Sequence, residues 1–144
     1  MSYVRILVHL VFSTKNRESL LSKEIRDKLY IHIHEYAGTK DIFLESIGGW
    51  NDHIHLLISL GKEQNISKIA NLLKGESSFW INKGKLLEIK FSWQDDYYAV
   101  SIGESGREKL IDYIKKQEEH HKSQGFVQEI NEILAKYKME NKGK

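Results

Sequence analysis

The residues of this chain best suited to chemistry are histidines in the tripeptide His-Ile-His, which occurs at positions 32–34 and again at 53–55. Side chains two apart project from one face of a strand, whereas on a helix they lie about 200° apart around the axis. The surrounding patterns predict a helix at the first copy and a strand at the second. His53 and His55 are therefore candidates to hold one divalent metal ion, and His32 and His34 are expected to be ordinary surface residues.

A second candidate group lies near the end of the chain. Tyr113 and Gln117 are four residues apart in a predicted helix, so they share one face of it, with His120 and His121 about one turn further on. Taken singly, Tyr113 could equally be a core aromatic residue and Gln117 a solvated polar one. A bare His-x-His could equally be a pair of strand histidines satisfied by neighbours. The hypothesis gains weight because the two groups complement each other.

The complementarity is chemical. A phenol with a pKa near 10 is a poor nucleophile at pH 7, and it becomes useful when a metal polarises the phosphate that it attacks. Two imidazole nitrogens and one amide oxygen would leave coordination positions open for phosphate and water, which suits Mg²⁺ or Mn²⁺. Tyr113, His53, His55 and Gln117 thus form a candidate phosphoryl-transfer site, while His9, His120 and His121 receive no role at this stage.

The elements that must position these residues follow from hydrophobic periodicity and turn signals. Ser22 is the expected N-cap of the first helix, and Gly48-Gly49 is expected to follow the first strand of a hairpin that has Asn51 and Asp52 as its turn residues. In chain order the sequence predicts a strand at 3–12, a helix from 22 to 38, strands at 42–47 and 54–60, a helix from 66 through 80, extended segments at 91–93 and 97–102, a helix around 110–117 and a last helix at 126–138.

The order strand, helix, strand, strand, helix, strand predicts an α+β, ferredoxin-like (RRM-like) sheet with its helices on one face and an added C-terminal helix. A length of 144 residues suits a single domain, 1–144, with a core at about 3–123 and the last helix at about 126–138. With 22 basic and 20 acidic residues the net charge is only +2, so any nucleic-acid surface must be local.

Other classes of protein are excluded or disfavoured by composition. The chain has no cysteine, which rules out disulfides, zinc fingers, iron–sulfur clusters and thiol nucleophiles. The apolar run at 6–12 carries His9 and is too short for a membrane span, so no membrane partner is expected and the cytoplasm is the default location. Lys15, Arg17 and Lys74 could contact backbone phosphates, although a single lysine is more often a solvated charge.

Five ordered segments resemble the single-tyrosine HUH transposases of small bacterial insertion sequences and their relatives that act on repetitive palindromes. The residues at 51–58 (NDHIHLLI) resemble that family's metal motif, and those at 113–121 (YIKKQEEHH) resemble its nucleophile helix. Further similarity lies at 11–17 (VFSTKNR), 73–78 (LKGESS) and 91–95 (FSWQD). Asn16 and Asn51 depart from the residues common in relatives, and neither touches the proposed chemistry.

The resemblance implies a transposase of bacteria or archaea. Tyr113 would become joined to a 5′ phosphate while a 3′ hydroxyl is released, and His53, His55 and Gln117 would bind Mg²⁺ or Mn²⁺. It also implies hairpin-bearing single-stranded DNA as the partner and a homodimer whose subunits share the active site. Two alternatives stay open: a catalytically lapsed or domesticated DNA- or RNA-binding module of RRM-like fold, and a metal-dependent phosphodiesterase that uses water and does not need Tyr113.

Overall fold

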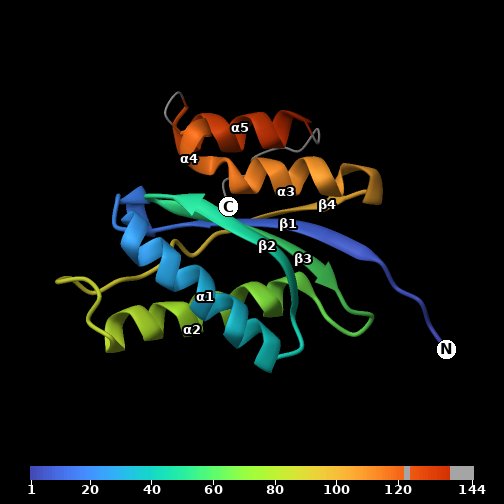
Figure 1. Cartoon of the computed structure of the whole chain (residues 1–144), viewed down its shortest axis with the longest axis horizontal. Coiled ribbons are helices and arrows are strands. Elements are labelled where there is room, and N and C mark those ends of the chain that lie inside the picture. The colour runs from blue at the N-terminus through green and yellow to red at the C-terminus, as the bar shows by residue number, and fades with distance from the viewer. Residues whose placement is uncertain (122–123, 137–144) are drawn as a thin grey trace.

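The computed structural model describes residues 1–121 and 124–136, which form one antiparallel sheet between two layers of helices (Figure 1). The sheet has the strand order β2-β3-β1-β4, and every neighbouring pair is antiparallel. The strands are β1 Ile6–Ser13, β2 Phe43–Trp50, β3 His53–Leu60 and β4 Tyr98–Ile102. The helices are α1 Lys23–Thr39, α2 Ile66–Lys83, α3 Arg107–Lys115, α4 Gln117–His120 and α5 Phe126–Lys136, with short 3-10 turns η1 Lys15–Arg17 and η2 Glu104–Gly106.

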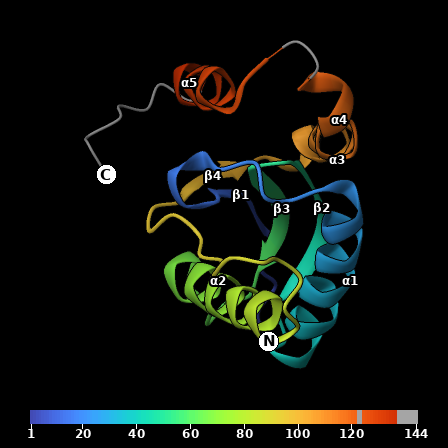
Figure 2. The same cartoon turned by 90° about the vertical axis from the view of Figure 1, so that its left-hand side faces the viewer.

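One face of the sheet carries the main hydrophobic core. Ile54, Leu56 and Ile58 alternate along β3 and pack against α1 and α2 together with Leu10 and Phe12 of β1. Figure 2 shows both helices on this side of the sheet. Each begins at a capping side chain: Ser22 Oγ accepts from the backbone N–H of the third following residue at 3.4 Å, and Asn65 Oδ1 does the same at 2.8 Å. The predicted ferredoxin-like arrangement of two helices on one face is confirmed.

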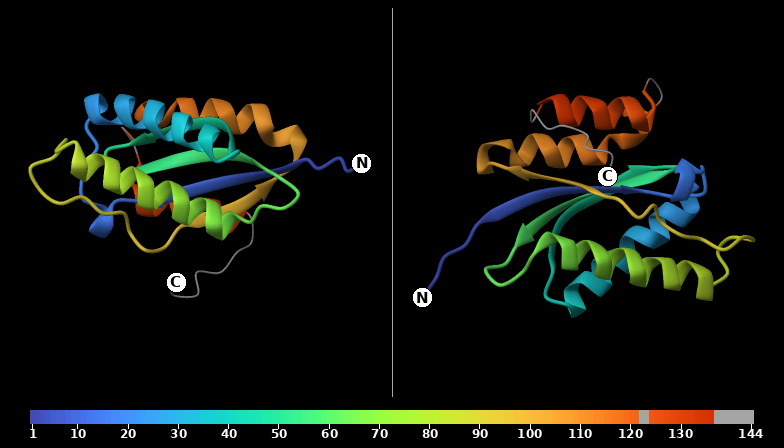
Figure 3. Two further views of the ribbon diagram at one scale, coloured as in Figure 1. Left: turned by 90° about the horizontal axis from the view of Figure 1, so that it is seen from below. Right: turned by 180° about the vertical axis from the view of Figure 1, so that it is seen from behind.

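The other face is covered by the C-terminal helices (Figure 3). Ile114 of α3 packs on Leu7 and Leu57, while α5 packs on Val11 in a cluster that includes Phe126. In Figure 2, α3 and α4 accordingly lie over β2 and β3, and α5 lies over β1 and β4. The predicted last helix begins at the expected residue, and its expected final positions, 137 and 138, lie outside the described residues. So do positions 122 and 123 of the predicted core.

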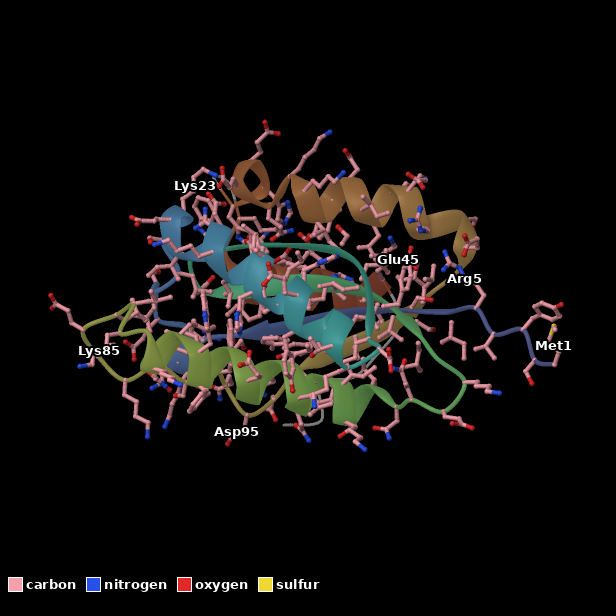
Figure 4. All side chains as sticks on the ribbon, turned by 60° about the horizontal axis from the view of Figure 1, so that its bottom comes forward. Met1, Arg5, Lys23, Glu45, Lys85 and Asp95 are labelled. Atoms are coloured by element: carbon pink, nitrogen blue, oxygen red, sulfur yellow. The ribbon has the colours of Figure 1, made fainter. Side chains whose placement is uncertain are left out.

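A buried carboxylate fixes the start of α3. Glu45 on β2 receives the Arg5 guanidinium at 2.9 Å and the Arg107 Nε–H at 2.6 Å, and Arg5 also pairs with Glu104 at 2.8 Å. The labelled Arg5 and Glu45 lie beside each other in Figure 4. Because bidentate and charge-assisted contacts to arginine are directional, this cluster orients the helix that carries Tyr113.

Two segments differ from the expected boundaries. The hairpin turns at Asn51-Asp52 as predicted, but its first strand continues through Gly48 and Gly49 to Trp50. A Cβ on Gly48 would meet the Ile114 carbonyl oxygen at 2.3 Å, so glycine there permits α3 to approach the sheet. The expected extended segment at 91–93 is not a strand of the sheet, and it contributes one bridge, Trp93 to Thr14. Phe91 and Trp93 serve the core instead, where Trp93 meets both Phe91 and Phe12 edge-on.

Candidate active site

The histidine pair of β3 faces the layer formed by α3, α4 and α5. His53 and His55 are both fully buried, and Ile54 between them points to the opposite core. Nδ1 of His53 lies 2.8 Å from Asp52 Oδ1, and Nδ1 of His55 lies 2.8 Å from Nε2 of His9 on β1. With both Nδ1 atoms engaged by neighbours, the two Nε2 atoms are directed into one shared space, as in histidines that bind metal.

Tyr113 and Gln117 reach this same space from the helices above. Gln117 is buried, and its Oε1 lies 3.1 Å from His53 Nε2. The Tyr113 ring meets the His55 ring edge-on at 5.6 Å between centroids, and its hydroxyl donates to the carboxylate of Glu129. The predicted single helix is interrupted at Lys116, which has φ −97° and ψ 20°, yet the structure brings all four predicted residues together.

Glu129 of α5 lies at the centre of the site and was missed by sequence reasoning. Its Oε1 is 3.0 Å from His53 Nε2, and its Oε2 is 3.2 Å from His55 Nε2 and accepts from Gln117 Nε2 at 3.0 Å. The sequence does contain a pattern that could have identified it: Glu129 lies on the apolar stripe of α5 with Phe126, Ile130, Ile133 and Leu134. A charged residue on an apolar stripe indicates either a buried partner or a site.

His120 and His121 complete the wall on the helix side. His121 Nε2 lies 2.9 Å from Glu129 Oε1 and 3.0 Å from Gln117 Oε1, and its Nδ1–H donates to the Gln124 carbonyl at 2.6 Å. His120 Nε2 lies 3.4 Å from the Tyr113 hydroxyl. These two histidines therefore contact the nucleophile and ligand candidates rather than solvent alone.

Burial and charge set the protonation of the group. Burial lowers the pKa of His55 to about 4, and burial together with the nearby His55 lowers the pKa of His9 to about 3, so both are neutral at pH 7. For His53 burial lowers the pKa, but Asp52 and Glu129 outweigh burial and raise it overall.

The carboxylate and the phenol respond in opposite directions. Burial raises the pKa of Glu129, but hydrogen bonds from His121 and His53, together with the adjacent His55 imidazole, outweigh it and hold that pKa far below its usual range. Burial, and then the adjacent Glu129, raise the pKa of Tyr113, so the phenol keeps its proton. The site therefore combines an ionised carboxylate, the neutral imidazoles of His9 and His55, and a protonated phenol.

The donor set fits a divalent cation. Ligand atoms of His53, His55 and Glu129 lie within 4.8 Å of one another, and His120, His121 and Glu129 form a second such group. Within residues 1–121 and 124–136, the buried side-chain nitrogen or oxygen left without a hydrogen-bond partner is His55 Nε2. A lone pair with no donor, beside a carboxylate and an amide oxygen, is suited to a metal that accepts mixed nitrogen and oxygen ligands.

The predicted phosphate-binding residues lie in two different places. Lys15 and Arg17 are exposed on η1 at the end of β1, where Arg17 lines a hollow with Ser13 and Phe126 beside the histidine pair. Lys74 lies on α2, across the sheet from that pair, and its Nζ donates to the Asp95 carbonyl at 2.7 Å. The turn that carries Lys15 and Arg17 therefore lies at the edge of the site, with Arg17 in the hollow beside the histidine pair and Lys15 in a separate hollow, and Lys74 is apart from both.

Comparisons with known proteins find transposases. The profile of the family described as "Transposase IS200 like" matches residues 2–117. The ISDra2 transposase TnpA of Deinococcus radiodurans is 26% identical over 114 residues, which are 76% of this chain and 81% of that protein.

Solved structures show the same fold. A crystal structure of a protein assigned as a transposase from Deinococcus radiodurans superposes with a TM-score of 0.66 at 24% identity, over 81% of this chain and 95% of the other. A REP-associated tyrosine transposase bound to a REP hairpin superposes with a TM-score of 0.63 at 16% identity, over 84% and 72%. Among the helices of the described residues, none is long and apolar enough to cross a membrane. Because the family profile matches most of the chain, this protein belongs to the family of IS200-like transposases.

Proposed function

We propose that this protein cuts and rejoins single-stranded DNA at hairpin-bearing ends through a covalent 5′-phosphotyrosine on Tyr113. Membership of the family implies a DNA-cleaving enzyme. One observation supports the finer proposal: the Tyr113 hydroxyl and the Nε2 atoms of His53 and His55 all contact the same carboxylate, so one small region is within reach of the nucleophile and both imidazoles. Metal ligands and a nucleophile need this proximity to act on one phosphate.

The proposed step is a transesterification. The Tyr113 oxygen attacks the scissile phosphorus, the bond from phosphorus to the 3′ oxygen breaks, the phenolic proton leaves, and a free 3′ hydroxyl forms. The phosphodiester is conserved in the phosphotyrosine, so a 3′ hydroxyl attacking that phosphorus rejoins DNA and releases the tyrosine. His53, His55 and Gln117 would hold Mg²⁺ or Mn²⁺, which supplies charge stabilisation at the phosphate oxygens.

Access and DNA contacts are compatible with this role. Tyr113 and Glu129 line a hollow between η2, α3 and α5, which also includes Lys109 and Lys136. Lys15 and Arg17 lie at the other edge of the site and are proposed to contact backbone phosphates. Hairpin DNA is proposed as the partner because a structural neighbour is a transposase bound to a REP hairpin. Such a reaction would take place in the cytoplasm of a bacterium or archaeon.

The test is a covalent-adduct assay. The protein is incubated with labelled single-stranded hairpin DNA and Mn²⁺, and a protein–DNA adduct is sought on a denaturing gel. Tyr113→Phe should abolish both cleavage and adduct, while Tyr3→Phe, at an exposed tyrosine on the N-terminal segment, should leave both unchanged. Cleavage by Tyr113→Phe without an adduct would instead identify a phosphodiesterase that uses water, and binding without cleavage by the unmodified protein would identify a DNA-binding module.

We also propose that the protein is a homodimer. In this structure one chain supplies Tyr113 together with His53 and His55, whereas the resemblance implies a site shared between subunits. Mixing a His53→Ala chain with a Tyr113→Phe chain separates the two arrangements. Recovered cleavage would demonstrate sharing across a dimer, and no recovery in a mixture shown to contain heterodimers would assign the nucleophile to its own chain.

A further inference from the structure

The family profile matches residues up to 117, so helix α5 contributes to the site from beyond the matched region. Figure 3 shows α5 beside α3 on the side of the sheet away from α2. Its residue Glu129 is only 1% exposed. Burying a carboxylate is costly unless specific partners compensate it, so this position calls for a chemical explanation.

The partners of Glu129 are the atoms that a cation would face. One carboxylate oxygen lies 3.0 Å from His53 Nε2, and the other lies 3.2 Å from His55 Nε2. The second contact has the distance of an ion pair without the geometry of a hydrogen bond, since His55 Nε2 has no hydrogen-bond partner in the described part of the chain. Both Nδ1 atoms are already held by Asp52 and His9, so the Nε2 atoms of the two imidazoles are the ones that face the carboxylate.

We propose that Glu129 is an anionic ligand of the divalent cation, so that α5 forms one wall of the metal centre; the proposal rests on the function proposed above. The ligands would be His53, His55 and Glu129, whose donor atoms already lie within 4.8 Å of one another, with Gln117 Oε1 within 3.1 Å of His53 Nε2. An added carboxylate raises the affinity for hard cations such as Mg²⁺ and Mn²⁺ relative to a site with only imidazole and amide donors.

Two other roles for Glu129 make different predictions. A plain ion pair would hold α5 against the sheet and would contribute stability without affecting metal binding. A carboxylate standing where the scissile phosphate binds would block the substrate, so its removal would accelerate cleavage at unchanged metal affinity. A ligand, in contrast, is required for tight metal binding before any DNA is present.

The experiment measures Mn²⁺ binding by the full chain without DNA, by electron paramagnetic resonance of free Mn²⁺ or by calorimetry. Glu129→Gln keeps the shape of the side chain and removes its charge, and the matched control is Glu132→Gln, an exposed carboxylate on the same helix. We expect Glu129→Gln to weaken Mn²⁺ affinity by about 10–100-fold, the range seen when supporting carboxylates of metal sites are lost, and Glu132→Gln to change it less than about twofold. Circular dichroism confirms that each variant is folded.

A thermal readout provides an independent check on the same proteins. Saturating Mn²⁺ should raise the Tm of the unmodified protein and of Glu132→Gln, and should raise that of Glu129→Gln much less, because a ligand that binds the folded state stabilises it according to its affinity. Wild-type Mn²⁺ affinity in Glu129→Gln would overturn the proposal, and faster cleavage at that affinity would identify the blocking role.

Failure of this inference is distinguishable from failure of the proposed function. If His53→Ala abolishes Mn²⁺ binding while Glu129→Gln leaves it intact, the histidine site stands and only the role of Glu129 falls. If neither substitution changes Mn²⁺ binding, or the unmodified protein binds none, the metal centre itself is wrong.

Discussion

The two copies of His-Ile-His have the same three side chains and very different surroundings. In α1, Ile33 is buried while His34 is exposed and His32 is half-buried, stacked on Trp80 with ring centroids 4.2 Å apart and in contact with Glu76. His32 is therefore more than the ordinary surface residue that the pattern predicted. The helical period separates the two imidazoles, so they have no common partner among the described residues.

In β3 the same tripeptide places both imidazoles on one face. His53 and His55 are buried, each has a neighbour at Nδ1, and both Nε2 atoms contact Glu129. The comparison shows that the backbone period and the residues facing it, rather than the tripeptide itself, decide whether two histidines can share one site. Each prediction below tests one part of that difference.

The largest difference expected is in catalysis. His53→Ala or His55→Ala should reduce cleavage of hairpin DNA in Mn²⁺ by at least about 10³-fold, because each removes a proposed ligand, while His34→Ala should leave the rate unchanged. The rates are measured by gel under single-turnover conditions. A comparable loss in His34→Ala, with folding intact, would show that the helical copy also takes part.

The next effect concerns the residue that orients His55. His55 Nδ1 lies 2.8 Å from His9 Nε2, and this contact fixes the ring with its Nε2 directed into the site. We expect His9→Ala to weaken Mn²⁺ affinity by about 10–100-fold, with partial recovery in His9→Gln. Calorimetry on the folded variants decides this, and an unchanged affinity in His9→Ala would assign His9 to packing alone.

The free energy of unfolding at acid pH should also distinguish the buried His9 and His55 from the exposed His34 of α1. In the folded protein the pKa values of His9 and His55 are lowered to about 3 and about 4. Below the pKa of a histidine in the unfolded chain, the unfolded chain therefore binds more protons than the folded one. Their contribution is present above about pH 6.5 and is lost as pH falls toward the folded values.

Between pH 7 and pH 5, with EDTA present, His9 and His55 should each lower the free energy of unfolding by about 2 kcal/mol, and His53, whose pKa is raised, should offset part of that loss. Urea titrations at the two pH values measure the change. The slope should be the same in His34→Ala, since that residue is exposed. A stability that rises on acidification would contradict the neutral assignment of His9 and His55.

The contrast between the two copies was largely predictable, because it depends on local periodicity. Alternation around Ile54 predicted one face for His53 and His55, and four-residue spacing placed Tyr113 and Gln117 together despite the break at Lys116. What makes the strand copy a site was not predictable in the same way. Asp52 and His9 become partners only when the hairpin and the neighbouring strand are in register.

The role of Glu129 depends on tertiary packing even more strongly. It requires α5 to dock on the histidine face of the sheet, and no local pattern specifies which surface a short amphipathic helix will cover. The extension of β2 beyond the predicted end at residue 47 has a similar origin. Two glycines locally favour the end of a strand, yet the missing side chain of Gly48 permits the approach of α3 to β2.

The smallest predicted effect concerns what the two copies share. Ile33 and Ile54 are both almost completely buried in the same core, so removing one methylene from either should cost a similar amount. We expect Ile33→Val and Ile54→Val each to lower the free energy of unfolding by about 0.5–1.5 kcal/mol, as measured by urea titration. Because β-branched residues favour strands, the strand variant should lie at the lower end of that range.

Neither change should alter Mn²⁺ affinity, since both side chains point away from the imidazoles. A loss of Mn²⁺ affinity in Ile54→Val alone would mean that core packing beneath β3 sets the spacing of the histidines, and the backbone period would then be an insufficient account of the difference.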